Sequence, residues 1–207
     1  MAVGAKPDTL APVLARRLGC AIQIAAVLAA VAGCGGGSKS SGHATTVFRV
    51  PSPSMAPTYR VGQHVVVDIE AYAHARPQRG DVVVFHPPGG ALSTQCGVPA
   101  QPADGHPCAR PTPQVAVGSS FIKRIASVGG DRIKIVGNRT YIGGKAQTEP
   151  FINKTTPCDQ LCNLPRPITV LPGYFFVLGD NRGESDDSRV WVPIPQSSIV
   201  GKVIGTK

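Results

Sequence analysis

The sequence predicts a mainly β domain made of several short strands. Its 207 residues include 24 glycines and 20 prolines, a composition that favours frequent turns over long helices. Hydrophobic residues make up 42% of the chain, which is enough for a packed core. They occur in short runs between turn signals, as is typical of strands, and no long amphipathic helix pattern follows residue 45.

The N-terminal residues 1–36 have the pattern of a membrane anchor or of a lipoprotein-type signal. Three positive charges, Lys6, Arg16 and Arg17, precede an apolar run over residues 20–33. As a helix this run is short for the hydrocarbon core of a bilayer, which is about 30 Å thick. The positive flank predicts that the N-terminus lies on the inner side of the cell membrane and the rest of the chain on the extracytoplasmic side.

The end of this apolar run leaves three alternatives open. Small residues precede Cys34, and residues 37–45 form a flexible linker, a pattern that resembles a bacterial lipoprotein signal with Cys34 as the lipidated residue. The segment also fits an uncleaved anchor or a cleaved secretory signal. The first two alternatives keep residues 46–207, the predicted extracytoplasmic β domain, tethered to the membrane.

From residue 46 onward, strand signals alternate with turn signals. The run Val82-Val83-Val84-Phe85, after the turn Arg79-Gly80-Asp81, is typical of a buried strand, and Gly143-Gly144 indicates a hairpin turn. In chain order, the expected strands are residues 46–50, 61–68, 82–85, 121–128, 132–136, 174–178 and 198–204, with a hairpin over 138–145. Residues 148–167 are expected to form a loop.

Four cysteines in the two long loops predict crosslinks. Cys96 and Cys108 lie in a Pro- and Gly-rich insertion at residues 86–117, whereas Cys158 and Cys162 lie in the later loop. In a chain with an export-type start, four cysteines predict two disulfides, and the locally simplest of the three pairings joins each neighbouring pair. A four-cysteine zinc site is the alternative, but the spacing of the first pair is unlike that of zinc ligands.

The net charge limits the classes of partner. The formal charge is +9, from 21 Lys and Arg against 12 Asp and Glu. The positive charges are scattered, without a run of five and without interleaved aromatic residues. This distribution argues against a nucleic acid partner and favours an anionic membrane surface.

The stretch Pro-Ser-Pro-Ser-Met-Ala-Pro-Thr at residues 51–58 holds two closely spaced hydroxyls, Ser52 and Ser54. Its three prolines exclude a helix interior or a central strand and predict a stiff, extended loop. Alone, the composition is typical of a linker. A serine hydroxyl becomes a nucleophile only when a base lies close enough to take its proton.

The candidate base is Lys123. Strand alternation places it between Phe121 and Ile125 on one face, where burial would lower the pKa of its amine. A surface lysine whose stem covers apolar residues is one alternative. A Ser-His-Asp triad is another, although the five histidines lie mostly in loops or at strand ends.

A polar cluster at residues 179–189 follows the strand expected at 174–178. It contains four acids, two arginines and two serines. A solvated turn and a calcium loop are the alternatives, but the EF-hand spacing is absent and the arginines would oppose a cation. The composition favours a hydrogen-bonded support for a reactive group.

Four stretches together resemble the type I signal peptidase family, peptidase family S26, which consists of membrane-bound serine proteases with a Ser-Lys dyad. They are PSPSMAPT (51–58), RGDVVVF (79–85), KRIASVGGD (123–131) and GDNRGESDDSR (179–189), in the order of the family's motifs. The resemblance runs from about Phe48 to Ile204. It implies a signal-peptidase-like fold of short antiparallel strands, preceded by one N-terminal membrane segment.

The resemblance implies a role for three residues of the reaction itself. Ser54 would be the nucleophile and Lys123 its general base. Ser52 would form an oxyanion hole together with the Ser54 N–H, since the developing negative charge requires two donors.

The resemblance also implies supporting residues within the 179–189 cluster. Ser185 would hydrogen-bond and orient the lysine amine, and the charges of Asp187 and Arg189 would brace that region. Arg124 is expected to meet an acid such as Asp180.

The chain departs from the family pattern at a few positions. Ser127 and Gly129 stand where the family usually has Gly and Pro, and Tyr59 stands where it usually has leucine. The insertion at 86–117 has no family role. None of these departures removes a catalytic group.

The resemblance implies an endopeptidase that removes signal peptides from exported precursors, with small side chains at P1 and P3. The expected partners are these precursors and membrane lipids, for a monomer without cofactor or metal. One alternative is a Ser-Lys self-cleaving regulator, which would need a DNA-binding domain where this chain has a membrane signal. Another is a non-catalytic, membrane-tethered lipoprotein of the same fold that binds exported peptides or partner proteins.

Overall fold

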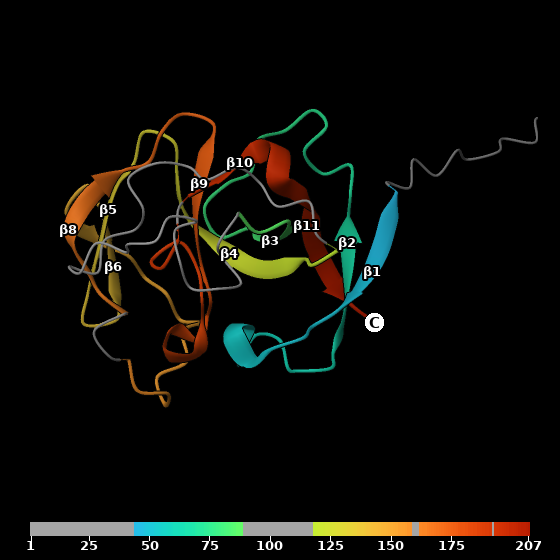
Figure 1. Ribbon diagram of the computed structural model, residues 1–207, viewed down its shortest axis with the longest axis horizontal. Helices are drawn as coiled ribbons and strands as arrows, with labels where there is room; N and C mark the ends of the chain where they lie inside the picture. Colours follow the sequence, from blue (N-terminus) through green and yellow to red (C-terminus); the bar gives the residue numbers. More distant parts are fainter. Residues whose placement is uncertain (1–43, 89–117, 159–161, 192) are drawn as a thin grey trace, which may run out of the picture. The chain divides into compact units, whose positions relative to one another are not determined.

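The computed structural model of the chain describes residues 44–88, 118–158, 162–191 and 193–207. Secondary structure in these ranges consists of strands and short 3-10 turns (Figure 1). The strands are β1 (Thr45–Arg49), β2 (His64–Asp68), β3 (Val82–Phe85), β4 (Phe121–Val128), β5 (Arg132–Val136), β6 (Arg139–Ile142), β7 (Lys145–Ala146), β8 (Leu164–Thr169), β9 (Tyr174–Leu178), β10 (Ile194–Pro195) and β11 (Ile199–Thr206). A helix with the length and hydropathy needed to cross a bilayer is not found among these residues.

Several expectations fall outside this description. Residues 1–43, with the predicted membrane segment and Cys34, lie outside the described residues. So does most of the 86–117 insertion, including Cys96 and Cys108.

A seven-stranded sheet contains the strands that the sequence marks most clearly. Its order is β1-β2-β11-β3-β4-β9-β10, and every neighbouring pair is antiparallel. The prediction of a mainly β fold with antiparallel strands is therefore confirmed. The C-terminal strand β11 lies inside the sheet, between β2 and β3 (Figure 1).

A second, four-stranded sheet has the order β7-β6-β5-β8 and is also antiparallel. Its edge strand β8 corrects the sequence prediction, which placed residues 148–167 in a loop. The strand contains Pro165 and Pro167, and proline cannot donate to a ladder of hydrogen bonds. An edge strand has one side without a partner strand, so it accommodates proline.

Burial follows the strand patterns. All four residues of β3 are buried, because β11 and β4 cover its two edges and side chains pack on both faces. In β5, by contrast, only Ile133 and Ile135 are buried, which is the alternation of a strand with one face in the core. Apolar packing of this kind fixes the register of each strand.

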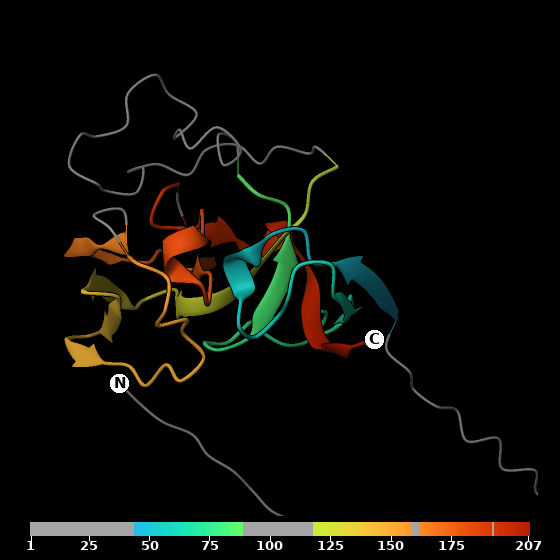
Figure 2. The same ribbon diagram turned by 90° about the horizontal axis from the view of Figure 1, so that it is seen from below.

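Two short turns connect the sheets to the polar residues that the sequence singled out. Turn η1 (Pro53–Met55) lies in the connection from β1 to β2, and turn η3 (Arg182–Glu184) follows β9. The two turns contact each other and lie side by side in both views (Figures 1 and 2). Segments distant in the sequence therefore meet at this point, beside strand β4.

Candidate active site

The proline-rich stretch folds into turn η1 rather than remaining extended throughout. Pro53 occupies the start of the turn, where its missing N–H is not needed. The N–H of Ala56 donates to Pro53 O at 2.9 Å, and the N–H of Tyr59 donates to Met55 O at 2.9 Å. Met55 is fully buried in the core beside Val50. The turn is thus anchored by the side chain that follows Ser54.

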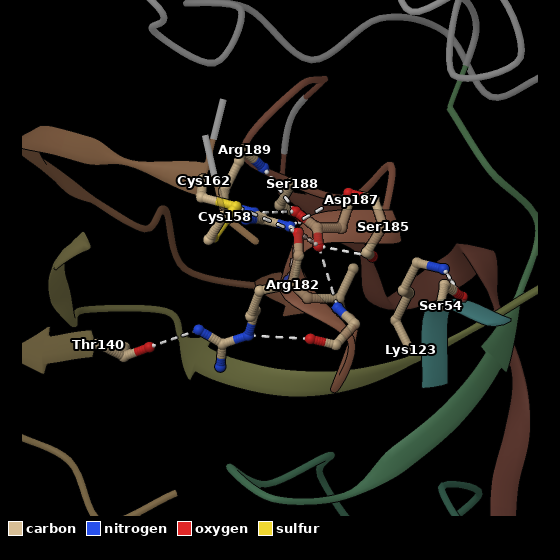
Figure 3. Close-up of polar contacts among 12 residues, drawn as sticks. Ser54, Lys123, Thr140, Cys158, Cys162, Arg182, Ser185, Asp187, Ser188 and Arg189 are labelled. Atoms are coloured by element: carbon tan, nitrogen blue, oxygen red, sulfur yellow. Dashed lines mark hydrogen bonds and ion pairs between the residues drawn. A yellow bond between two sulfur atoms is a disulfide. The ribbon is translucent and has the colours of Figure 1, made fainter. Parts of the chain in front are cut away.

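Strand β4 brings Lys123 to this turn. The Lys123 side chain is 4% exposed, and Ser54 is 3% exposed. Lys123 Nζ donates a hydrogen bond to Ser54 Oγ at 2.7 Å, and Ser52 Oγ donates to the same oxygen at 3.1 Å. Figure 3 shows the amine of Lys123 directed at the Ser54 hydroxyl. The structure therefore brings together three of the residues singled out by the sequence.

The environment of Lys123 changes its acidity. Burial lowers the pKa of its amine from the ordinary 10.5 to about 8, because removal from water penalises the ammonium form. The carboxylates of Asp187 and Asp186 act in the opposite direction, and the positive charge of Arg189 adds to the lowering. The neutral amine is consequently accessible near physiological pH, as a general base requires.

The buried carboxylate of Asp187 organises the residues behind Lys123. Its Oδ2 accepts hydrogen bonds from Gly179 N at 3.0 Å, Ser185 Oγ at 2.8 Å and Arg189 Nη2 at 2.8 Å. Its Oδ1 accepts from Arg189 Nε at 2.7 Å (Figure 3). Burial would raise the pKa of Asp187, but the charge of Arg189 and these hydrogen bonds outweigh it and hold the pKa below its ordinary value.

The hydroxyl of Ser185 is directed at Asp187 in this structure. The resemblance implied a hydrogen bond from Ser185 to the lysine amine, whereas the hydrogen bond described here is the one to Asp187 Oδ2. Ser185 therefore affects Lys123 only indirectly. It holds the Asp187 carboxylate, whose charge raises the pKa of the lysine amine.

Gly179 allows the polar cluster to approach the serine turn. A Cβ at this position would stand 2.5 Å from Ser54 O and would also overlap Ser185 Oγ. Both contacts would be closer than the contacts that Cβ atoms make in real structures. The glycine at 179 is thus required by close packing rather than by its backbone angles.

Asp180 holds the opposite end of the proline-rich stretch. Arg124 Nε donates to Asp180 Oδ1 at 2.8 Å and Arg124 Nη2 to Oδ2 at 2.7 Å, which confirms the expected pairing of these residues. Thr58 Oγ1 donates to the same carboxylate. The guanidinium of Arg124 also lies 4.0 Å from the ring centre of Phe151. Sequence reasoning did not identify Thr58 or Phe151.

Arg182 ties the cluster to the four-stranded sheet. Its Nη2 donates to Glu149 Oε1 at 2.7 Å, Nη1 to Thr140 Oγ1 at 3.2 Å and Nε to Gly179 O at 2.9 Å. Burial lowers the pKa of the guanidinium, an effect that the Glu149 carboxylate opposes. Glu149 lies in a loop with no sequence signal of its own, so this partner could not be foreseen.

A disulfide lies beside the same cluster. Cys158 and Cys162 are joined, with Cα atoms 5.4 Å apart. Cys162 Sγ is 3.4 Å from Arg182 O, a carbonyl that also accepts a hydrogen bond from Arg189 Nη2 at 2.8 Å. The crosslink thus supports the turn that carries Arg182.

The site pairs the Ser54 hydroxyl with a buried lysine amine of lowered pKa. This arrangement can activate a serine hydroxyl as a nucleophile.

Sequence reasoning also did not identify Asn181 as a functional residue. Its backbone N–H donates to Ser54 O at 2.9 Å, so it contacts the serine turn directly.

Comparisons with known proteins give one consistent result. A family model described as signal peptidase, peptidase S26, matches residues 21–206. Probable signal peptidase I-1 of Synechocystis sp. is 34% identical over 155 residues, which are 75% of this chain and 67% of the relative. Signal peptidase IB of Staphylococcus aureus is 31% identical over 171 residues, which are 76% of this chain and 75% of the relative.

The extent of these matches varies. The chain spans between 36% and 67% of the length of the cyanobacterial and chloroplast relatives. A crystal structure of a signal peptidase I from Enterococcus faecalis matches 62% of this chain and 97% of that chain, with 23% identity and a TM-score of 0.39.

Proposed function

Because the chain belongs to the signal peptidase family, peptidase S26, it is a serine endopeptidase, and we propose that it acts as signal peptidase I. In this function it removes signal peptides from exported precursor proteins, with Ser54 as nucleophile and Lys123 as general base. The observation that carries the assignment of these roles is the 2.7 Å hydrogen bond between a buried lysine amine and the Ser54 hydroxyl.

In the first step, Ser54 Oγ attacks the scissile carbonyl while the neutral amine of Lys123 takes the hydroxyl proton. The carbonyl oxygen becomes an oxyanion, which accepts hydrogen bonds from the Ser54 N–H and the Ser52 hydroxyl. In this structure, Ser52 Oγ lies 3.1 Å from Ser54 Oγ. Rotation of the Ser52 hydroxyl would redirect its hydrogen to the oxyanion.

In the second step, the Lys123 ammonium gives its proton to the leaving amine, and the peptide bond breaks. Water then attacks the acyl-enzyme while Lys123 takes a proton from it, and the ester bond breaks as that proton passes to Ser54 Oγ, which restores the free hydroxyl and the neutral amine. Asp187 supports this cycle, because its carboxylate favours the ammonium that forms transiently. Ser185 and Arg189 hold that carboxylate in place.

The membrane location belongs to the same proposal. The N-terminal segment would hold the catalytic domain on the extracytoplasmic face of the cell membrane, where precursors present their cleavage sites. Mass spectrometry of the mature N-terminus distinguishes the two modes of attachment. An intact Met1 fits an uncleaved anchor, and a chain that begins at lipidated Cys34 fits the lipoprotein mode.

The proposed function predicts selective cleavage of a precursor. The purified full chain in detergent should cut a precursor with alanine at P1 and P3 after the P1 residue, as read by mass spectrometry of the products. The matched control is the same precursor with phenylalanine at P1, which should remain uncut. Failure to cut the alanine precursor, or equal cleavage of both, would contradict the proposal.

A second prediction concerns pH. Because the reactive form of Lys123 is neutral, kcat/KM should rise about tenfold per pH unit below the amine pKa and level off above about 8. Rates measured from about pH 6 to pH 10 with a peptide substrate provide the test. A limb centred near pH 6.5 would point to histidine instead and would exclude Lys123 as the base.

A further inference from the structure

Asn181, which lies outside turn η1, donates hydrogen bonds to the carbonyls of Pro53 and Ser54. Asn181 Nδ2 donates a hydrogen bond to Pro53 O at 3.3 Å, and the Asn181 N–H donates to Ser54 O at 2.9 Å. Asn181 therefore contacts the carbonyl on each side of the Ser54 Cα.

The first of these contacts has a directional consequence. Pro53 O and the Ser54 N–H belong to the same planar, trans peptide group, in which the C=O and N–H bonds point in opposite directions. A donor that holds Pro53 O on one side consequently aims the Ser54 N–H away on the other side. That N–H is the backbone donor of the proposed oxyanion hole.

The amide of Asn181 is oriented for this task. Its Nδ2 also donates to Glu184 Oε2 at 3.3 Å, so both hydrogens of the amide face acceptors. The reverse orientation would turn Oδ1 toward the Pro53 carbonyl and the Glu184 carboxylate, neither of which can donate. This orientation leaves Asn181 Oδ1 buried and without a hydrogen-bond partner among the described residues. Its cost is smaller than that of the reverse orientation, which would leave both acceptors facing another acceptor.

Contacts of the neighbouring residues hold the backbone around Asn181 in place. Asn181 precedes turn η3, where the Glu184 N–H donates to Asn181 O at 3.1 Å. The preceding residue, Asp180, is paired with Arg124 on β4, the strand that carries Lys123. A single segment therefore links the serine turn to the strand of the lysine.

We infer that Asn181 is a positioning residue that aims the Ser54 N–H at the oxyanion. This inference rests on the proposed function, and it assigns to Asn181 an effect on the transition state rather than on the binding of substrate. Pro53 O also accepts from the Ala56 N–H at 2.9 Å, so loss of Asn181 misdirects the turn without abolishing it.

The test compares Asn181→Ala with the wild type in the full chain. We expect kcat to fall by about 10- to 100-fold, less than the ~10²–10³ that follows removal of an oxyanion donor, with KM nearly unchanged. A peptide aldehyde forms a tetrahedral adduct on the serine, so its inhibition constant should rise by a similar factor. The affinity for an uncleavable peptide of the same sequence should stay the same.

Two controls separate positioning from folding. Asn163→Ala also removes a side-chain bond to a turn, because Asn163 Oδ1 accepts from Gly137 N, but on the four-stranded sheet. It should leave kcat and aldehyde inhibition unchanged. Asn181→Asp keeps the size of the side chain but replaces the donor with an acceptor, and it should lower kcat at least as much as alanine does.

Several results would overturn the inference. They are an unchanged kcat, a raised KM at constant kcat, and a loss of kcat without a matching loss of aldehyde affinity. A shift in the pH limb of Asn181→Ala would also overturn it, since Asn181 should not act through Lys123. Undiminished cleavage by Ser54→Ala would instead reject the proposed function itself, so the two failures are distinguishable.

Discussion

Replacement of Lys123 by methionine is expected to lower the turnover of a precursor by about 10⁴-fold, the upper range for loss of a general acid–base. Methionine fills much of the same buried space but cannot take the Ser54 proton at 2.7 Å. Ser54→Ala should cost more, on the order of 10⁶-fold. Because the two groups act as a unit, the double variant should be no less active than Ser54→Ala alone.

The matched control for this experiment is Lys134→Met. Lys134 also lies on a strand and contacts an aromatic ring, with its Nζ 5.2 Å from the centre of Tyr141, but it belongs to the four-stranded sheet. Precursor cleavage, measured as initial rates on electrophoretic gels, should be close to wild type in this variant. Cleavage by Lys123→Met at the wild-type rate would remove the lysine from the mechanism.

Replacement of Asp187 by alanine is expected to destabilise the folded chain by about 3–5 kcal/mol. The Asp187 carboxylate accepts from Gly179, Ser185 and Arg189, and its loss would leave the buried Arg189 guanidinium without this counter-charge. Denaturation by urea, followed by fluorescence of the full chain in detergent, measures the change in the free energy of unfolding.

The neighbouring Asp186→Ala is the control, because Asp186 is exposed and its removal should change stability by only a few tenths of a kcal/mol. The pH dependence gives a second readout. Since the pKa of Asp187 is lowered on folding, its stabilising contribution is complete above its unfolded pKa of about 3.9. It is lost as pH falls through the lower folded pKa, and Asp187→Ala should lack this acid-dependent loss. Equal stability of the two alanine variants would contradict the assigned role of Asp187.

The strands that could be predicted from the sequence are those with strong local signals. The run at 82–85 and the alternating runs at 121–128 and 132–136 correspond to β3, β4 and β5. The insertion of β11 between β2 and β3 could not be predicted, since pairing between distant strands leaves no mark in either one. The edge strand β8 is not recognisable from its sequence, because its two prolines are unusual in a strand and are tolerated only at an edge.

The motifs predicted which residues form the site, but not all of the contacts between them. Ser54 and Lys123 were expected to meet from their motifs, and their roles stay predictions until the variants are measured. The partners of the cluster were less accessible. Ser185 was expected at the lysine amine but contacts Asp187. Asn181 lies within the 179–189 motif but was assigned no role, because its contacts depend on how two turns pack.

The position of β11 has a consequence for how the two halves of the site are held together. Ser54 lies in the connection between β1 and β2, Lys123 lies on β4, and β11 is the strand that joins β2 to β3 within the seven-stranded sheet. Without β11, strands β1 and β2 would have no ladder of hydrogen bonds to the strands from β3 to β10. The approach of Ser54 to Lys123 therefore depends on a strand that carries neither residue.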